Sequence, residues 1–169
     1  GVWHLMEGLP YAVRLAAGLR RPRNPVRGLE LAGVVERVGA EVTAFAPGDA
    51  VFGIGDGSFA EYTRASPSKL VHKPSNVGFE EAAAVSVSAT TALVGLRAAE
   101  VEAGQTVLIT GAGGGVGSCA VQIARAMGAE VTGVCSTSKL DFVRSLGAAD
   151  AIDYTREDIA HLFVRRFKA

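Results

Sequence analysis

The amino-acid sequence predicts an α/β protein in which a small β-rich domain precedes the first half of a doubly wound parallel sheet. The strongest indication is residues 106–117, where an apolar strand leads through a glycine turn directly into a helix. A strand at 130–135, a helix at about 138–146 and a strand at 150–154 follow, which together give a βαβαβ unit. Residues 31–64, by contrast, contain short strand-like runs without helices between them.

The spacing of apolar and capping residues supports the βαβαβ unit. The run Val107–Ile109 is typical of a strand that is buried on both faces. After the glycine turn, apolar residues recur at helical spacing, and Gly128 stands where a C-terminal helix cap is expected. These apolar positions are Val116, Ala120, Ile123, Ala124 and Met127. In the second helix, Ser138 and Asp141 have the spacing of a capping box, and Gly147 ends the helix.

The N-terminal part has the pattern of a small β domain. Strands are predicted at 31–38, 50–54 and 58–64, and Gly39 and Pro47-Gly48-Asp49 break the chain between the first two.

The boundary between the two predicted domains lies near residues 74–78. Residues 1–78 form the β domain, and residues 79–169 form the nucleotide-binding domain. A helix from Phe79 to Ala99 leads into the second domain.

The glycine turn predicts a binding site for the pyrophosphate of a dinucleotide. Glycines allow a tight turn and a close approach of the backbone to an anion, and the N–H groups and positive dipole end of the next helix face the phosphates. A glycine run alone also occurs in ordinary loops, but the strand before it and the helix after it favour the binding site. The predicted cradle consists of Gly113, Gly114, Gly115, Val116 and Gly117.

The end of the second strand favours NADPH over NADH. A carboxylate that holds the free 2′-hydroxyl of NADH is usually found there, but this strand ends in Cys135-Ser-Thr-Ser-Lys139. Ser136, Thr137 and Lys139 supply hydroxyls and an ammonium group, which suit a 2′-phosphate. A plainer interpretation is that the hydroxyls cap the helix and Lys139 is solvated; both interpretations can hold.

Further motifs occur in order along the chain. Residues 28–53 and Phe59-Ala-Glu-Tyr62 are followed by Phe79-Glu-Glu-Ala-Ala-Ala84 and Ala89-Thr-Thr-Ala-Leu93. Over essentially the whole chain, this series resembles the medium-chain dehydrogenase/reductase superfamily. The turn Ala112-Gly-Gly-Gly-Val-Gly117 is similar to that of its quinone oxidoreductase branch. The motifs similar to the NADPH-dependent alcohol dehydrogenase-like members of that branch are Trp3-His-Leu-Met6, Cys135-Ser-Thr137 and Ile152-Asp-Tyr154.

The resemblance implies a GroES-like β domain that carries the substrate pocket and a Rossmann domain, with the nicotinamide in the cleft between them. It places Thr91 near the nicotinamide arm and Tyr154 near the adenine side of the cofactor. Trp3 and Tyr11 are candidates for the substrate pocket, with packing in the core as the plainer alternative. Family members are considerably longer, so we expect both domains to be incomplete and the chain to be an internal fragment of a homodimeric parent.

The resemblance also gives two reasons to expect no zinc. Zinc-dependent members place a histidine ligand where Leu29 stands, and leucine has no lone pair to offer a metal. A structural zinc lobe needs four cysteines, whereas this chain has only Cys119 and Cys135. Without a Lewis acid to polarise an alcohol, reduction of an electron-poor acceptor is favoured over alcohol oxidation.

The expected function is therefore an NADPH-dependent, zinc-independent oxidoreductase. It would transfer hydride to a quinone or to an activated C=C or C=O bond of a small molecule. No catalytic acid or base is assigned. Two alternatives remain open, namely a non-catalytic nucleotide-binding fragment and an enoyl reductase module of a larger synthase.

Composition agrees with this expectation. The chain has 17 basic and 17 acidic residues, so its net charge of zero gives no indication of nucleic acid as a partner. No uninterrupted apolar run of transmembrane length is present, so a membrane partner is not expected either. The two cysteines suit a reducing compartment, which predicts a cytoplasmic protein.

Overall fold

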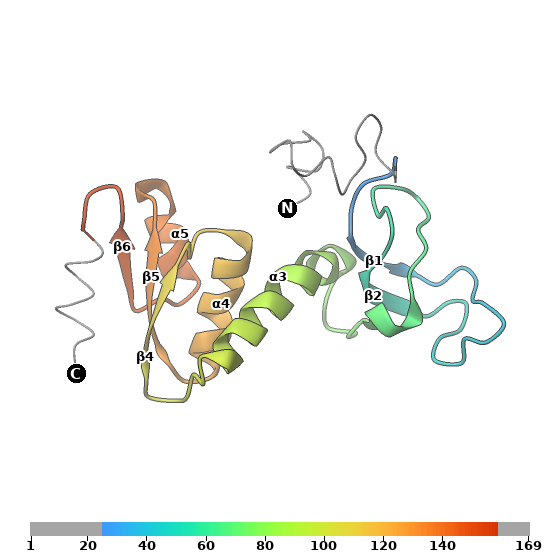
Figure 1. Ribbon diagram of the computed structural model, residues 1–169, viewed down its shortest axis with the longest axis horizontal. Helices are drawn as coiled ribbons and strands as arrows, with labels where there is room; N and C mark the ends of the chain where they lie inside the picture. The colour runs from blue at the N-terminus through green and yellow to red at the C-terminus, as the bar shows by residue number, and fades with distance from the viewer. Residues whose placement is uncertain (1–24, 159–169) are drawn as a thin grey trace. The chain divides into compact units, whose positions relative to one another are not determined.

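The computed structural model describes residues 25–158, which form two compact units. The first unit extends to Val87 and the second begins at Ser88, so the division falls inside helix α3 (Phe79–Ala98) (Figure 1). Each unit has a three-stranded sheet of its own. The pocket candidates Trp3 and Tyr11 lie outside the described residues.

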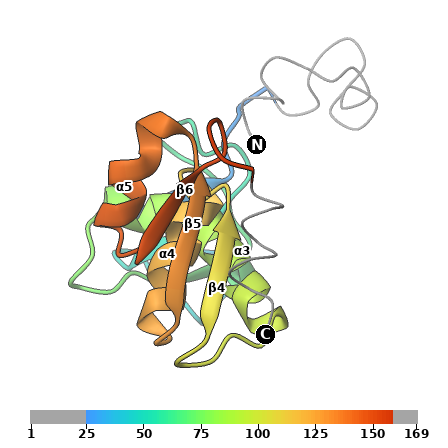
Figure 2. The same ribbon diagram turned by 90° about the vertical axis from the view of Figure 1, so that its left-hand side faces the viewer.

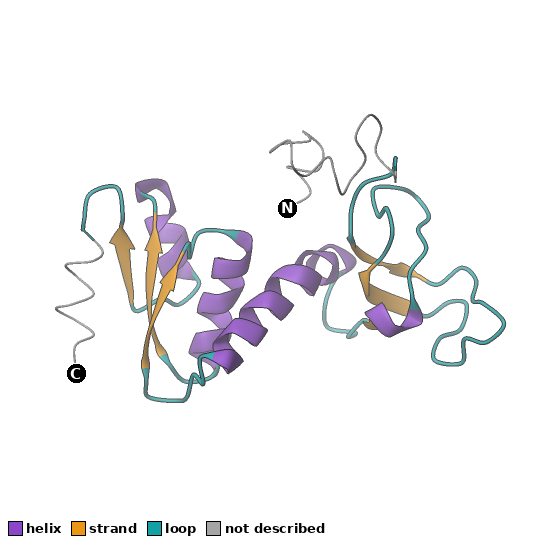
Figure 3. Ribbon diagram, viewed as in Figure 1, coloured by secondary structure: helices purple, strands orange, loops and turns teal. Residues whose placement is uncertain are grey.

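The first unit contains an antiparallel sheet with the strand order β1-β2-β3. Ala32 pairs with Phe52, and Phe52 pairs in turn with Val71. Loops connect these short strands over most of the unit (Figure 3). This arrangement is the expected partial GroES-like β domain. Its elements are β1 (Glu30–Val34), β2 (Ala50–Ile54), the 3-10 turn η1 (Pro67–Lys69) and β3 (Leu70–His72).

The predicted strand at 58–64 does not form. Only an isolated bridge joins Asp56 to Arg64. The amide of Phe59 donates to the carbonyl of Arg27 (2.8 Å), so this segment lies against the chain before β1 instead of pairing along a strand. The side chains of residues 58–64 alternate as they do in a strand. This pattern does not determine whether the backbone has a neighbouring strand to pair with.

The other strands of this unit differ from the prediction at their ends. β1 stops at Val34, before the predicted end at Val38, because its regular pairing with β2 ends there. The amide of Val35 still donates to Asp49, but the carbonyl of Val35 accepts from Gly48 (both 2.9 Å), and the amide of Asp49 donates to Ala46 instead. β3 was not predicted, since three residues are too few to show a period of two.

The second unit contains a parallel sheet with the order β4-β5-β6, joined by two helical crossovers. Leu108 pairs with Thr132, and Gly133 pairs with Ala151. Helices α4 and α5 lie against the same face of the sheet (Figure 2). The predicted βαβαβ order is confirmed. Its elements are β4 (Thr106–Thr110), α4 (Gly115–Ala126), β5 (Glu130–Cys135), η2 (Thr137–Lys139), α5 (Leu140–Ser145) and β6 (Asp150–Asp153).

The start of the second crossover helix differs from the prediction. The 3-10 turn η2 comes first, and neither η2 nor α5 has a side-chain hydrogen bond at its N-cap. The predicted capping box of Ser138 and Asp141 is therefore wrong. Asp141 instead lies 3.4 Å from the guanidinium of Arg144, and the Ser138 hydroxyl lies 3.4 Å from that of Ser136.

The core of the second unit lies between the sheet and its helices. Val121 of α4, Val131 of β5 and Val143 of α5 are its largest fully buried side chains. Ala92 and Leu96 of α3 join the same cluster. Burying each large aliphatic side chain contributes about 1.5–3 kcal/mol, so this cluster holds the two crossovers against the sheet.

Helix α3 is long and apolar enough, by length and composition, to cross a membrane, and it is the only such helix within residues 25–158. Acidic residues occupy its first turn and Arg97 its last, where they complement the helix dipole. Because Ala92 and Leu96 pack in the core of the second unit, we interpret α3 as a helix of the folded domain.

The glycine of β5 gives a test of this packing. A Cβ atom at Gly133 would lie 2.5 Å from Cγ1 of Val143 and 3.0 Å from Cβ of Ala112. Gly133→Ala should therefore lower the free energy of unfolding by about 1–3 kcal/mol in urea unfolding. The control is Gly95→Ala, because Gly95 lies exposed in α3 with nothing within 4 Å of its added Cβ. That change should stabilise the chain by about 0.5–1 kcal/mol, and equal losses in both variants would contradict the packing argument.

Candidate cofactor-binding site

The glycine turn begins at the carboxyl end of β4 and ends at the first residue of α4. Gly111 adopts a φ of 68°, a left-handed conformation that favours glycine. The amide of Ala112 donates to Val134 (2.9 Å), which keeps the turn beside β5. The amide of Gly114 donates to the carbonyl of Gly111 (2.9 Å) and closes the turn.

The start of α4 leaves a row of backbone donors unused. The first hydrogen bond of the helix runs from the amide of Ser118 to the carbonyl of Gly114 (2.8 Å). In the described part of the chain, the amides between Ala112 and Ser118 make no hydrogen bond, apart from that of Gly114. Unused amides at the positive end of a helix are an anion-binding arrangement. The unused amides are those of Gly113, Gly115, Val116 and Gly117.

Gly114 therefore differs in role from the other members of the predicted cradle. Its N–H group closes the turn onto Gly111, so it has no donor left for a phosphate. The remaining four positions keep their donors. Gly114, Gly115 and Val116 are exposed to solvent, Gly113 is half-buried and Gly117 is buried. The assignment of these positions to a pyrophosphate stays a prediction.

Two of these positions have room only for glycine. A Cβ atom at Gly117 would overlap the carbonyl oxygen of Gly111, because the first turn of α4 lies directly on the end of β4. A Cβ atom at Gly113 would lie 2.9 Å from Cβ and 3.0 Å from Cγ of Lys139. The glycine turn and the segment after β5 are therefore immediate neighbours.

The segment after β5 carries the residues predicted to bind a 2′-phosphate. The exposed ammonium of Lys139 lies 5.6 Å from the ring centroid of Phe142, within the range of a cation–π contact. The hydroxyl of Ser136 is half-buried beside η2. The hydroxyl of Thr137 donates to the carboxylate of Asp153. Its assignment to the 2′-phosphate stays a prediction.

Asp153 is a site residue that the sequence did not single out. It is the last residue of β6, it is only 4% exposed, and its carboxylate also accepts bonds from the hydroxyl (2.7 Å) and the amide (3.0 Å) of Thr155. The bond from Thr137, followed by that from the Thr155 hydroxyl, holds the pKa of Asp153 below that of an ordinary carboxyl group. The motif Ile152-Asp-Tyr154 contained this residue, but nothing in it indicated burial.

The remaining predicted residues are placed as follows. Tyr154 is 56% exposed, and its amide donates to Cys135 (3.2 Å), so it lies at the same edge of the sheet. Thr91 is an exposed residue of α3. The sequence did not indicate the hydroxyl of Ser88, which lies 3.2 Å from where a Cβ on Gly115 would stand.

The described residues do not fit a zinc site. Among them, no three His, Cys, Asp or Glu side chains come together as metal ligands. Leu29 is 45% exposed and has no donor atom. Cys135 is buried, and burial, together with the charge of Asp153, raises the pKa of its thiol, which therefore stays protonated.

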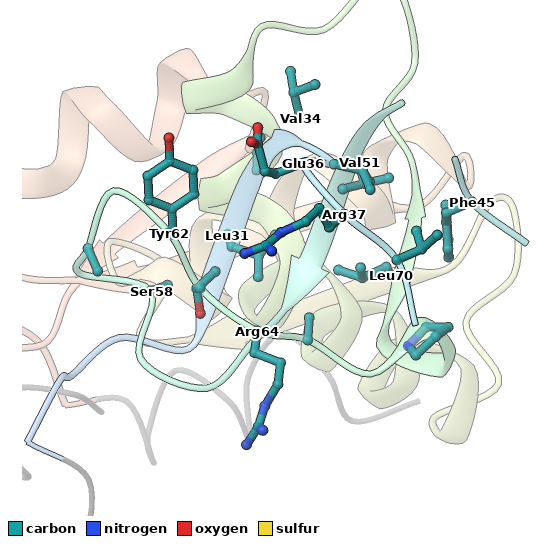
Figure 4. Close-up of a pocket in the computed structure, with 18 of the residues that line it drawn as sticks. Leu31, Val34, Glu36, Arg37, Phe45, Val51, Ser58, Tyr62, Arg64 and Leu70 are labelled. Carbon is teal, nitrogen blue, oxygen red and sulfur yellow. The ribbon is translucent and has the colours of Figure 1, made fainter. Parts of the chain in front are cut away.

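The first unit has a hollow of about 720 Å³ on its antiparallel sheet (Figure 4). Leu31, Val51 and Leu70 line it from the three strands, and Arg37 and Tyr62 add polar atoms. A lining of apolar side chains with a few polar atoms suits a small organic molecule. We assign no catalytic residue to this hollow.

Two domain families match this chain. Residues 3–75 match the alcohol dehydrogenase GroES-like domain, and residues 115–167 match the zinc-binding dehydrogenase domain. Together with the parallel sheet and its glycine turn, these matches show that the chain belongs to the medium-chain dehydrogenase/reductase superfamily. Within the superfamily it falls in the quinone oxidoreductase-like branch.

Individual relatives support this placement. The chain is 39% identical over 153 residues to 2-methylene-furan-3-one reductase of Solanum lycopersicum, covering 83% of this chain and 39% of that protein. The structure of Escherichia coli quinone oxidoreductase complexed with NADPH matches with a TM-score of 0.78 and 30% identity, covering 90% of this chain and 48% of that one. CurK enoyl reductase matches with a TM-score of 0.83 and 32% identity, covering 98% and 51%. The chain thus spans about half or less of the length of these relatives.

The hydrogen bonds of Asp153 predict a pH dependence of stability. Because they lower its pKa in the folded chain, the stability they contribute is complete above the ordinary carboxyl pKa of 3.8 and is lost as the pH falls through the folded value. The difference in unfolding free energy between the wild type and Asp153→Asn should be constant above about pH 5 and shrink below it in urea unfolding.

Asp141→Asn is the control for this experiment, because it removes a fully exposed carboxylate and should alter stability little at any pH. A difference for Asp153→Asn that persisted unchanged in acid would show that its carboxylate does not contribute through its charge.

Proposed function

We propose that this chain contains the cofactor-binding part of an NADPH-dependent, zinc-independent oxidoreductase that reduces a quinone or an activated C=C or C=O bond. The observation that carries the proposal is the row of unused amides at the start of α4, directly after a parallel strand. This arrangement suits the pyrophosphate of a dinucleotide.

The residues around that row suit the rest of the cofactor. The amides of Gly113, Gly115, Val116 and Gly117 would hold the pyrophosphate. Ser136 and Lys139 would bind the 2′-phosphate, because a hydroxyl and an ammonium group donate to an anion. Tyr154 would lie at the adenine side and Thr91 toward the nicotinamide arm. When bound, the cofactor supplies a hydride.

The chain's own contribution is binding and orientation. Fixed backbone amides do not have to reorganise when an anion binds, so they hold the pyrophosphate in one place relative to the sheet. A cofactor held in this way keeps its reactive end in a constant position, which favours transfer to an acceptor bound nearby. We assign no proton donor.

The relatives favour acceptors that are small molecules. The names of the two enzymes described above refer to a 2-methylene-furan-3-one and to a quinone, and the E. coli structure contains NADPH. The similarity to CurK enoyl reductase favours a second candidate, an enoyl reductase module of a larger synthase. A non-catalytic nucleotide-binding role is the third candidate function. We further propose a homodimeric, cytoplasmic parent protein without nucleic acid or membrane as partner.

The 2′-phosphate assignment is tested by Lys139→Ala. Loss of a charge-assisted hydrogen bond should raise the Kd for NADPH by about 10- to 100-fold and leave the Kd for NADH nearly unchanged, as measured by nicotinamide fluorescence. Lys69→Ala is the matched control, because Lys69 is also an exposed lysine at the end of a 3-10 turn. Equal affinity of the wild type for NADPH and NADH would contradict the assignment.

The acceptor is tested by following NADPH oxidation after a quinone, an enone or an enoyl thioester is added. Turnover with the quinone or the enone supports the first candidate, and turnover with the thioester alone supports the synthase module. Binding of NADPH without any turnover supports the non-catalytic role.

A further inference from the structure

Asp153 is a buried carboxylate beside the predicted 2′-phosphate site. It is one of only two buried polar residues among residues 25–158. Its oxygens accept hydrogen bonds from the hydroxyls of Thr137 and Thr155 and from the amide of Thr155, and the guanidinium of Arg156 lies 3.7 Å away. With these donors inside the protein, the carboxylate does not require a ribose hydroxyl as a partner.

The bond from Thr137 ties β6 to η2. Thr137 is the first residue of η2, and this turn carries Lys139 as its last residue. Neither η2 nor α5 has a side-chain cap of its own. Bonds within the turn are local, such as that from the Lys139 amide to Ser136 (2.9 Å), whereas the bond to Asp153 anchors the turn to another strand.

The position of Lys139 depends on this anchor. The stem of Lys139 lies beside Gly113, and its ammonium lies over the ring of Phe142, which belongs to the helix that η2 leads into. A lysine side chain has considerable rotamer freedom, so a fixed backbone is needed if it is to meet a phosphate in one place. A loose η2 would let Lys139 move away from Gly113.

We propose that Asp153 is a positioning residue for cofactor selectivity, which acts through Thr137 to hold η2 so that Lys139 meets the 2′-phosphate of NADPH. The proposal rests on the proposed function, because that function supplies the phosphate. It also changes the role of Thr137 from a phosphate ligand to a tie, since a hydroxyl has one proton and this one is donated to Asp153.

Simple electrostatics predicts the opposite effect, which makes the proposal easy to test. A carboxylate near a phosphate site repels the ligand, so its neutralisation alone should tighten NADPH binding. If Asp153 only stabilised the fold, its neutralisation would weaken the binding of NADPH and of NADH to the same extent. Only the positioning role predicts that neutralising the carboxylate weakens the binding of NADPH selectively.

The experiment compares the dissociation constants of NADPH and NADH for three variants by nicotinamide fluorescence. Asp153→Asn and Thr137→Val should each raise the Kd for NADPH about tenfold and change the Kd for NADH less than about twofold. Thr137→Ser keeps the hydroxyl and should restore the wild-type values. Because Thr137 is exposed, its variants test the tie even if Asp153→Asn does not fold.

Asp141→Asn is the matched control, because it removes a carboxylate from the first turn of α5 without touching the tie. For this variant, the ratio of the Kd for NADPH to the Kd for NADH should equal that of the wild type. Tighter NADPH binding by Asp153→Asn, equal weakening of both cofactors, or failure of Thr137→Ser to restore binding would each overturn the proposal.

Hydrogen exchange without cofactor separates this proposal from the proposed function. The amides of Lys139 and Leu140, which bond to Ser136 and Thr137, should exchange faster in Asp153→Asn and Thr137→Val than in the wild type. Unchanged exchange would overturn the tie and leave the proposed function standing. Equal binding of both cofactors by the wild type would instead overturn the 2′-phosphate assignment and the selectivity role with it.

Discussion

The candidate site depends on one constraint, which is that the first amides of α4 have no acceptor within the described chain. A helix leaves its first N–H groups without partners in the helix, and a capping side chain, water or a ligand satisfies them. Here the N-cap is Gly114, which has no side chain to donate or accept. The glycine turn thus keeps these donors available and places them at the end of β4, where a parallel sheet of this kind binds its ligands.

The close packing around this turn also depends on glycine residues. The first turn of α4 comes near the end of β4 only because Gly117 has no Cβ atom to strike the carbonyl of Gly111. The absence of a Cβ atom on Gly113 leaves room for the stem of Lys139, and its absence on Gly133 lets α5 come close to β5. These approaches bring the proposed pyrophosphate cradle and the proposed 2′-phosphate residues to one edge of the sheet. The cost is that a larger residue at any of these positions would force its neighbours to move.

The sequence predicted most of the second unit because each signal there was local. An apolar run marked β4, helical spacing marked α4, and the glycine turn stood directly between a strand and a helix. In the first unit the alternating residues 58–64 predicted a strand, but strand pairing depends on a partner elsewhere in the chain, and the backbone there bonds to residues before β1. The local residue pattern could not show whether residues 58–64 pair as a strand.

The site shows the same division between local and long-range information. The sequence could name the candidate cradle residues, but the use of the Gly114 N–H group to bond Gly111 depends on the three-dimensional form of the turn. The hydroxyl of Thr137 could be recognised as polar, whereas its partner Asp153 lies 16 residues away on another strand. Burial and pairing of this kind are tertiary facts that residue type and spacing do not contain.

The most direct test of the cradle follows backbone amide signals by NMR while NADPH is added. The signals of Gly113, Gly115, Val116 and Gly117 should shift strongly, because their N–H groups gain phosphate acceptors, and the signal of Gly114 should shift less, because its N–H group remains bonded to Gly111. Binding that left these four signals in place and moved others would contradict the cradle.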